Sequence, residues 1–357
     1  MNDHPAPHAA APGVAPQDAA TQDAAALDAH SPETRPAVVV CGSLAIDVIG
    51  YYGGALQGAT QQGRLSQSIQ LDRLDVDFGG CAMNIAYSLA LHGARPYPIV
   101  RVGRDFRAGY AAHLQGLGIS AEGILVDEAF ASSSHCIVLS DRDGNQLTAF
   151  YPGSSNPEAS ARMPHHDAGA LGARVGARLA LIAPDVAANM LRHAELLAAR
   201  DIPFVTDPGQ GLPDFDADSA HALIARSRSL ILNEHEWNVL LRLLDADEAS
   251  LRERLDWIVI TEGAAGLRVL GQQADFRLPA IAPATTVDHT GCGDALRGGL
   301  LHGLALGASL EDALRIGTLT ATYNLEARGC QRHHFEVAGF VARYEHSWQR
   351  SWPLPRD

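Results

Sequence analysis

The sequence predicts an α/β fold of three layers, in which helices cover both faces of a mainly parallel central sheet and a small β lid stands beside it. Short apolar runs alternate along the chain with segments of helical periodicity, an order that produces parallel strands joined by helices. Two other segments alternate apolar and polar residues, as strands with one exposed face do. The chain has 357 residues, of which 46% are hydrophobic, so it can bury a large core.

The folded domain is expected to span residues 37–345. Residues 1–36 are rich in Ala, Pro, Asp and His without apolar periodicity, and we expect them to form a disordered tail. Residues 346–357 are expected to form a C-terminal tail. Apolar runs predict the strands of the central sheet at Ala37–Cys41, Pro98–Val102, Leu179–Ile182, Pro203–Thr206, Leu230–Leu232 and Trp257–Ile260.

The lid strands are expected within about residues 48–78 and 132–152. In the second segment, His135–Ser140 alternates in polarity, and the Asp-Arg-Asp-Gly turn at 141–144 has the residues of a hairpin turn. These strands would not fit the central sheet, whose strands are apolar throughout. We therefore expect a separate small sheet.

The composition excludes several functions. The formal net charge is −14 and the arginines are scattered, so we expect no nucleic-acid partner. All 27 basic residues are arginine, which excludes Schiff-base chemistry and a Walker P-loop, since both need a lysine. Any phosphate site must therefore use backbone amides, arginine or a metal ion.

The cysteines and the hydropathy indicate a cytoplasmic protein. The five cysteines lie far apart without C-x-x-C spacing, so neither a zinc cage nor a disulfide framework is predicted. The chain has no apolar run of about 18 residues and no secretion signal, and we expect no membrane partner.

A glycine-rich segment, Asp288–Asp294, follows Ala284–Val287, the expected end of a strand, and precedes a helix. Glycines let backbone N–H groups converge, and the helix N-terminus adds positive potential, so this segment predicts a site for a transferring phosphoryl group. Asp294, in the first helical turn, is placed to take a proton from a hydroxyl nucleophile. The alternative is that Asp294 only caps the helix and the glycines only turn the chain.

The string D-x-T-G-x-G-D resembles the signature of the ribokinase-like, or PfkB, family of sugar and nucleoside kinases. Four other segments match that family in order: Gly79–Gly93, Val102–Asp105, Asn233–Glu236 and Thr261–Gly266. The resemblance covers about residues 37–340. It implies a ribokinase-like fold, ATP as phosphate donor and Mg²⁺ as cofactor.

The resemblance also implies residue roles at the phosphate. Asp294 would be the catalytic base, and the backbone amides of Gly291, Cys292 and Gly293 would form the anion hole. A monovalent cation, in particular K⁺, would bind near the following residues: Asp288 and Thr290.

On the ATP side, the resemblance gives Asn233 and Glu236 the task of ordering water around Mg²⁺ and the phosphates, which suits the reluctance of Mg²⁺ to lose its waters. Thr261, Gly263 and Gly266 would lie along ATP. Without the resemblance, Glu236 is a solvated helix residue and the glycines belong to an ordinary turn.

On the acceptor side, the resemblance implies that Asp47 binds a pair of sugar hydroxyls, because a carboxylate accepts two hydrogen bonds well. It also places Gly79, Gly80 and Asn84 in the same pocket. The alternative for Asn84 is a helix N-cap. Arg297 has two open interpretations: it contacts phosphate, or it packs along the helix and holds a surface carboxylate.

The predicted acceptor is the 5′-hydroxyl of a nucleoside. The residues within the motifs look most like those of bacterial adenosine and broad-specificity nucleoside kinases. Two alternatives remain: a sugar kinase of the same family that acts on ribose or a fructose derivative, and a non-catalytic protein that senses a nucleoside. The protein is expected to be a monomer or a homodimer.

Overall fold

A computed structural model describes residues 35–56, 68–143, 145–272 and 274–355. Residues 1–34 of the expected N-terminal tail, and residues 57–67 of the first lid segment, lie outside this part of the chain. In the described part, the backbone of Arg95 donates to the carbonyl of Pro36 at 2.9 Å. The folded part therefore starts one or two residues before the predicted Ala37.

The central sheet contains nine strands in the described residues, and seven of them run parallel. Two further strands add antiparallel at one edge. In spatial order the strands are β13 (Phe276–Leu278), β12 (Leu267–Leu270), β11 (Trp257–Thr261), β10 (Ser229–Asn233), β9 (Phe204–Thr206), β8 (Leu179–Ile182), β1 (Ala37–Cys41), β4 (Arg95–Val102) and β5 (Ile124–Val126).

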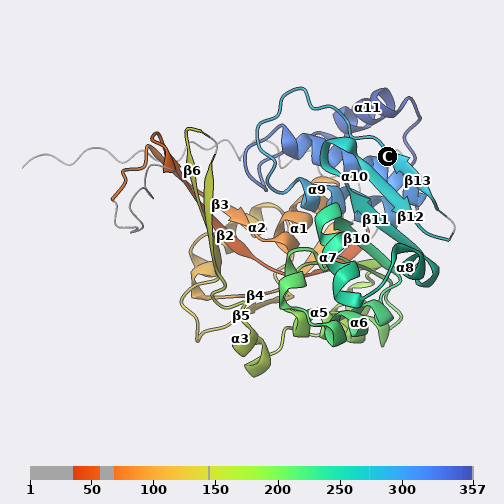
Figure 1. Ribbon diagram of the computed structural model, residues 1–357, viewed down its shortest axis with the longest axis horizontal. Coiled ribbons are helices and arrows are strands. Elements are labelled where there is room, and N and C mark those ends of the chain that lie inside the picture. Colours follow the sequence, from red (N-terminus) through yellow and green to blue (C-terminus); the bar gives the residue numbers. More distant parts are fainter. Residues whose placement is uncertain (1–34, 57–67, 144, 273, 356–357) are drawn as a thin grey trace, which may run out of the picture.

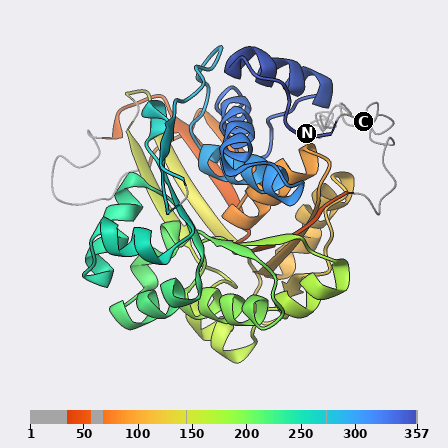
Figure 2. The same cartoon turned by 90° about the vertical axis from the view of Figure 1, so that its right-hand side faces the viewer.

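Alternate residues of the central strands enter two different cores. In β1, Val38 and Val40 pack on one face of the sheet, and Val39 and Cys41 pack on the other. This is the period-two alternation of a strand whose two faces are both covered. Figure 2 shows the sheet between the two helical layers, so the predicted three-layer α/β/α order is confirmed.

One helical layer covers the face on which Val38 lies. Its helices are α1 (Cys81–Leu91), α2 (Tyr110–Gly116), α9 (Cys292–Ala305) and α10 (Leu310–Leu325), with α11 (Val337–Trp348) packed on the outside of α10 (Figure 1). The opposite layer consists of α4 (Ala168–Val175), α5 (Ala187–Ala198), α6 (Ala217–Arg226), α7 (Glu234–Leu244) and α8 (Glu248–Arg254). The short helices are η3 (Arg104–Ala108), α3 (Pro157–Arg162), η4 (Gly209–Asp214) and η5 (Gly263–Ala265).

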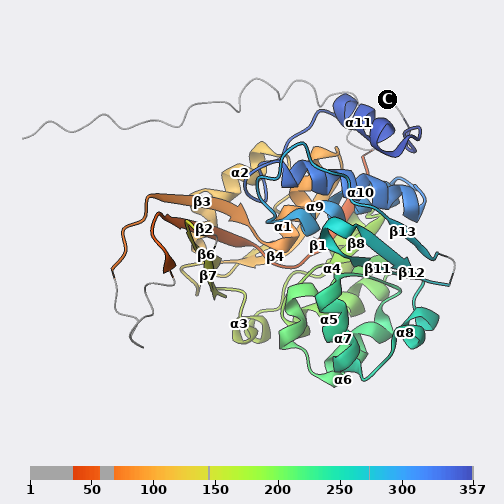
Figure 3. The ribbon, with the colours of Figure 1, turned by 45° about the horizontal axis from the view of Figure 1, so that its top comes forward.

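The lid is a second sheet of four strands, in the order β3 (Arg73–Gly79), β2 (Ala45–Tyr52), β6 (Ser134–Asp141) and β7 (Gln146–Tyr151). It projects to one side of the central sheet (Figure 3). Its strands β2 and β6 run parallel, whereas β2–β3 and β6–β7 are antiparallel. The chain passes from β1 through Gly42 directly into β2, so the floor of the lid meets the carboxyl end of the central sheet.

Two segments differ from the expectations at the ends of the domain. Ala284–Val287 is not the end of a strand: it has irregular structure, and the Val287 amide donates to the carbonyl of Leu325 at 2.9 Å. The expected tail from residue 346 begins inside α11, and Leu354 is buried while the Trp352 ring packs edge-on against Tyr344. No helix of the described residues has both the length and the apolar composition that crossing a membrane requires.

Candidate active site

Two adjoining cavities open at the carboxyl ends of the parallel strands, where ligands bind in open α/β sheets. The larger holds about 550 Å³ and faces the lid, and the smaller holds about 300 Å³ and faces α7 and η5. Predicted site residues that line the larger cavity are Asp47, Gly80, Asn84, Thr290, Gly291 and Asp294. Those that line the smaller one are Asn233, Glu236, Thr261, Gly263, Gly291, Gly293 and Asp294.

Asp294 lies where the two cavities meet, because it lines both. It is in the first turn of α9, and the helix begins after Gly291, whose φ of 78° is left-handed. The Asp294 carboxylate does not cap its own helix. Its Oδ2 instead accepts a 2.8 Å hydrogen bond from Asn84 Nδ2 on α1. The alternative that Asp294 serves only as a cap is therefore excluded.

A chain of buried side chains orients the Asn84 amide. Gln331 Nε2 donates to Asn84 Oδ1 at 2.9 Å and lies 2.9 Å from the hydroxyl of Tyr110. That hydroxyl donates to the carbonyl of Gly79 at 2.8 Å. Since Asn84 Oδ1 is taken by Gln331, its NH₂ group points at Asp294. Asn84 lies within α1 and Gly80 occupies the N-cap position, so Asn84 is not the N-cap.

The carboxyl group of Asp294 has an unusual proton affinity. Burial raises its pKa to about 6, against the opposing effects of the Asn84 hydrogen bond and the Arg297 charge. Asp47 and Glu236 contribute in the same direction as burial. A pKa near the working pH suits a group that must be ionised and yet able to accept a proton.

The loop before α9 is held by α10 and the residues after it. Asp288 Oδ1 accepts from the Thr290 amide at 2.9 Å, and Oδ2 accepts from the Gly329 amide at 3.0 Å. Asn324 Nδ2 donates to the Thr290 carbonyl at 3.0 Å. The Asn324 Oδ1 atom is buried and has no hydrogen-bond partner among the described residues. Oxygen atoms thus gather beside the glycine turn.

Cys292 is the first residue of α9 and lines neither cavity. Its thiol faces the Asp288 carbonyl, with Sγ 3.9 Å from that oxygen. Burial raises the pKa of this thiol to about 11, so it remains protonated near neutral pH. The side chain offers the anion site nothing, and only the backbone of Cys292 can contribute there.

On the acceptor side, Asp47 projects from β2 of the lid into the larger cavity. Burial, followed by the charges of Asp77 and Asp288, raises its pKa to about 6. Gly79 makes room for this carboxylate, because a Cβ at Gly79 would lie 2.3 Å from Asp47 Oδ2. Gly79 itself does not line the cavity. Gly80 has φ 95°, and a Cβ there would lie 2.5 Å from the Ala45 backbone nitrogen.

On the opposite side, Asn233 and Glu236 form a reciprocal capping box at the start of α7. Asn233 Oδ1 accepts from the Glu236 amide and Glu236 Oε2 accepts from the Asn233 amide, each at 2.8 Å. Glu236 is therefore more than a solvated helix residue. Because the box engages one carboxylate oxygen, Oε1 is left for a second partner.

The two glycines predicted beside ATP have different surroundings. Gly263 has φ 59°, a Cβ added there would have no neighbour within 4 Å, and the residue lines the smaller cavity with Thr261. Gly266 has φ 98°, and a Cβ there would lie 2.1 Å from the Leu278 carbonyl of β13. Gly266 thus permits close packing of the β12 edge, and the structure does not bring it into either cavity.

A buried ion pair lines the smaller cavity beside Asp294. Arg297 Nε contacts Asp207 Oδ2, and Arg297 Nη1 donates to the Gly293 carbonyl at 2.9 Å. The partner of Arg297 is thus a carboxylate, as one of the two interpretations held, but this carboxylate is buried and not on the surface. Both side chains also line the smaller cavity. Neither Asp207 nor Gln331 was predicted as a site residue. Asp207 directly follows the predicted strand Pro203–Thr206, and this position could have identified it as a residue at the carboxyl end of the sheet.

The geometry suits transfer of a charged group between two bound molecules. A single carboxylate faces both cavities, glycine backbone at a helix N-terminus lies beside it, and Arg297 brings fixed positive charge. Preorganised N–H groups and a cation stabilise charge on a transferring phosphoryl group.

Comparison with known proteins identifies the family. The model of the pfkB family carbohydrate kinases matches residues 35–336. The chain belongs to the pfkB family. It is a phosphotransferase that acts on a hydroxyl group, as the resemblance implied, and the ribokinase-like fold is confirmed.

Three relatives illustrate the likeness. A Burkholderia thailandensis nucleoside kinase solved with inosine has a TM-score of 0.77 and 30% identity, covering 88% of this chain and 99% of that one. A Methanocaldococcus jannaschii nucleoside kinase, described as an archaeal member of the ribokinase family, has a TM-score of 0.77 and 26% identity over 87% of this chain and 98% of that one. An uncharacterized sugar kinase of Escherichia coli is 28% identical over 83% of this pfkB chain and 90% of its own.

Proposed function

We propose that this protein transfers the γ-phosphate of ATP to the 5′-hydroxyl of a nucleoside, with Asp294 as the base. The observation that carries the proposal is the position of Asp294 between two adjoining cavities. A hydroxyl in the larger cavity and a phosphate in the smaller one would both reach this carboxylate. The similar nucleoside kinase solved with inosine favours a nucleoside as the acceptor.

The larger cavity suits a ribose. Asp47 projects from the lid and Asn84 from α1, so a sugar between them would meet a carboxylate and an amide. A carboxylate accepts paired hydroxyl hydrogens, and an amide both donates and accepts. The space of about 550 Å³ extends from the sugar subsite to Phe150 of β7 and to the loop after β8, which leaves room for a base.

Asp294 performs the proton transfer in this proposal. Its pKa of about 6 leaves most of the carboxylate ionised at neutral pH. The attacking hydroxyl gives its proton to the Asp294 carboxylate as its oxygen bonds to the γ-phosphorus and the bond to the ADP oxygen breaks. The Asn84 hydrogen bond holds the carboxylate in place for this step.

The smaller cavity receives the phosphates of ATP. The backbone amides of Gly291 and Gly293, which line this cavity at the start of α9, would face the transferring group, because N–H groups there lack intrahelical partners. The Cys292 amide, the third member of the expected anion hole, donates to the His289 carbonyl at 3.4 Å and would have to leave that partner to contribute. Mg²⁺ neutralises phosphate charge when it is bound with the nucleotide. Glu236 and Asn233 present oxygens at the cavity wall, and Glu236 would hold water of the Mg²⁺ shell rather than the ion itself.

The residues beside the glycine turn fit a monovalent cation such as K⁺. Asp288 brings a carboxylate and Thr290 a hydroxyl, close to the backbone of Gly329. Among the described residues, the buried Oδ1 of Asn324 has no hydrogen-bond partner, which fits a cation beside it. A cation bound there would supply positive charge behind the anion hole.

A substrate panel tests the proposal. Purified protein with ATP and Mg²⁺ is given adenosine, inosine, guanosine, cytidine, uridine, ribose and fructose 6-phosphate, and ADP formation is followed. Phosphorylation of at least one nucleoside at the 5′ position, identified by phosphorus NMR, is the expected result. The sugar kinase from Escherichia coli favours the alternative acceptor, and activity on free sugars alone would exclude the nucleoside assignment. Binding without turnover would favour a nucleoside sensor.

Of the two assembly states, the lid favours a homodimer. One face of its sheet exposes Leu74, Val76, Ile137 and Leu147, which strand register places together. An exposed apolar patch of this kind marks an interaction surface. Sedimentation of the wild type against Val76→Asp checks the dimer. A cytoplasmic location is part of the proposal, since all five cysteines are unpaired and ATP is supplied there.

A further inference from the structure

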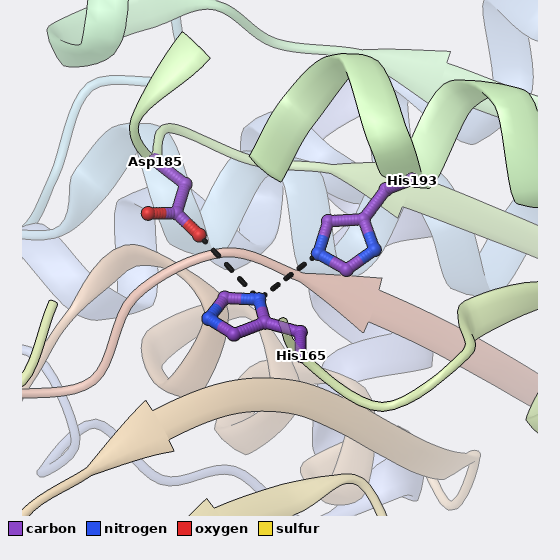
Figure 4. Close-up of side chains that lie close together, drawn as sticks. All are labelled: His165, Asp185 and His193. Atoms are coloured by element: carbon purple, nitrogen blue, oxygen red, sulfur yellow. Dashed lines mark hydrogen bonds and ion pairs between the residues drawn. The ribbon is translucent and has the colours of Figure 1, made fainter. Parts of the chain in front are cut away.

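Two histidines and an aspartate lie close together (Figure 4), and the aspartate lines the larger cavity, named the acceptor cavity below. His165 lies in the loop before α4, Asp185 follows β8, and His193 lies on α5. His165 Nδ1 is 3.1 Å from His193 Nε2 and 3.7 Å from Asp185 Oδ2. The three possible ligand atoms lie within 4.8 Å of one another. No step of the proposed kinase reaction uses the two histidines.

We propose that His165, Asp185 and His193 bind a divalent transition-metal ion, with Zn²⁺ the best match. Two imidazoles and one carboxylate form a common three-residue zinc set that leaves a fourth position open. Tetrahedral bonds of about 2.0–2.1 Å place two ligand atoms about 3.3 Å apart. The separations of 3.1 Å and 3.7 Å lie on either side of that value.

Hydrogen bonding alone does not satisfy this cluster. Two ring nitrogens 3.1 Å apart need one proton between them, so one ring donates and the other accepts. His193 Nδ1 is buried without a partner among the described residues in either tautomer, and a metal ion on Nε2 would leave the proton of this ring on Nδ1. A metal ion removes the need for the shared proton, because both nitrogens then present lone pairs to one point.

Burial and chemistry select the kind of ion. His165 is 4% exposed and His193 is 1% exposed, and burial of this degree disfavours a protonated ring. Neutral imidazole suits Zn²⁺ and related ions, whereas Mg²⁺ prefers oxygen ligands. The site is therefore chemically distinct from the Mg²⁺ position proposed at Glu236.

The surrounding charges are mixed. Positive charge near His165 comes from Arg101, Arg192 and His166. Negative charge near Asp185 comes from Asp214. Arg101 does not stand as a free cation, because its Nη1 lies 3.3 Å from Asp127 Oδ2 in a buried ion pair. The carboxylate of Asp185 is thus left as the ligand that would balance part of the charge of the ion.

The ion would join three separate segments at the wall of the acceptor cavity. Asp185 lines that cavity, and its Oδ2 also accepts from Asn189 Nδ2 of α5 at 3.0 Å. A metal bond would fix this side chain between α5 and the loop before α4. We therefore expect the metal to raise the thermal stability of the protein, whether or not the kinase proposal is correct.

The test uses the full chain, stripped with a chelator and returned to buffer with excess Mg²⁺. Co²⁺ is titrated first, since tetrahedral Co²⁺ has strong visible absorption, and Zn²⁺ is then added to displace it. The variants are His165→Asn and His193→Gln. The matched control is His166→Asn, which removes the exposed neighbouring histidine. Circular dichroism checks the fold of each.

We expect the wild type and His166→Asn to bind one Co²⁺ per chain with a tetrahedral spectrum, displaced by Zn²⁺, and to gain melting temperature with Zn²⁺. His165→Asn and His193→Gln should lose the spectrum and bind at least 10-fold more weakly. If His165→Asn fails to fold, His193→Gln decides, because its amide can still hydrogen-bond to His165. An unchanged spectrum in His193→Gln, or no stoichiometric binding by the wild type, would overturn the proposal.

Discussion

Asn84 Nδ2 donates a 2.8 Å hydrogen bond to Asp294 Oδ2 across 210 positions of sequence. The bond joins α1 to the helix that follows the glycine-rich turn, α9. It also holds the carboxylate that faces both cavities. The consequences of this geometry can be measured one residue at a time.

The first prediction concerns the proposed base. Asp294→Asn keeps the shape of the side chain and an oxygen for Asn84, but cannot take a proton. We expect kcat to fall by about 10²–10⁴-fold, with nucleoside affinity within a few fold of the wild type. Steady-state kinetics and calorimetric binding measure both. Asp218→Asn, on the exposed surface of α6, is the control, and near-normal turnover of Asp294→Asn would contradict the assignment.

The second prediction concerns the pH dependence of activity. The hydrogen bond from Asn84 lowers the pKa of Asp294, which burial raises to about 6. The wild-type kcat/KM should therefore decline as the pH falls through about 6, and Asn84→Ala should move this decline to higher pH. Asn238→Ala, an exposed position on α7, should leave the profile in place. An identical profile for Asn84→Ala would show that Asp294 is not the titrating group.

The third prediction is the pH dependence of stability. The folded-state pKa of Asp294, about 6, exceeds its ordinary value of 3.8, so the folded state holds the proton more tightly than the unfolded state. Its contribution to stability is present at low pH and is lost as the pH rises through about 6. Asp294→Asn should thus be stabilised relative to the wild type at pH 8, by on the order of 1–3 kcal/mol, and less so near pH 5. Urea unfolding at both values measures the difference, and a pH-independent difference would contradict it.

The fourth prediction compares two glycines with left-handed φ. Gly80 has φ 95° and backbone atoms 2.5 Å from a hypothetical Cβ, whereas Gly93 has φ 80° and no neighbour within 4 Å. Gly93→Ala should lower the free energy of unfolding by about 1–2 kcal/mol, because only the left-handed conformation is unfavourable there. Gly80→Ala should cost clearly more, because the backbone must also move. Equal costs would mean that the close approach to β2 is unimportant.

The fifth prediction concerns the buried ion pair. Asp207→Ala leaves the Arg297 guanidinium buried without its carboxylate, which should cost about 3–5 kcal/mol of unfolding free energy. The matched control is Asp256→Ala, which breaks a pair with Arg228 whose side chains are 54% and 81% exposed. Exposed pairs contribute about 0–1 kcal/mol. A similar loss in the two variants would show that Asp207 is not essential to the packing.

Several parts of the fold could be predicted from sequence because they depend on neighbouring residues. β8 spans the predicted Leu179–Ile182, since an all-apolar run suits a strand covered on both faces. The helix after the glycine turn was expected for a similar reason, because glycine tolerates the left-handed φ found at Gly291. The prediction that Ala284–Val287 ends a strand was wrong, because amides of this segment donate hydrogen bonds to residues at the end of α10 and not to a sheet.

The sequence alone determined six of the nine described strands of the central sheet and which carboxylate, Asp294, is presented by the glycine turn, since periodicity and glycine conformation are local properties. The short strands β5, β12 and β13 were not predicted. Only the tertiary structure decided what Asp294 meets. The order of the strands places Asn84, Gln331 and the Asp207–Arg297 pair around it. The same packing brings His165, Asp185 and His193 together. Such contacts depend on where distant elements are buried, and no local pattern records that.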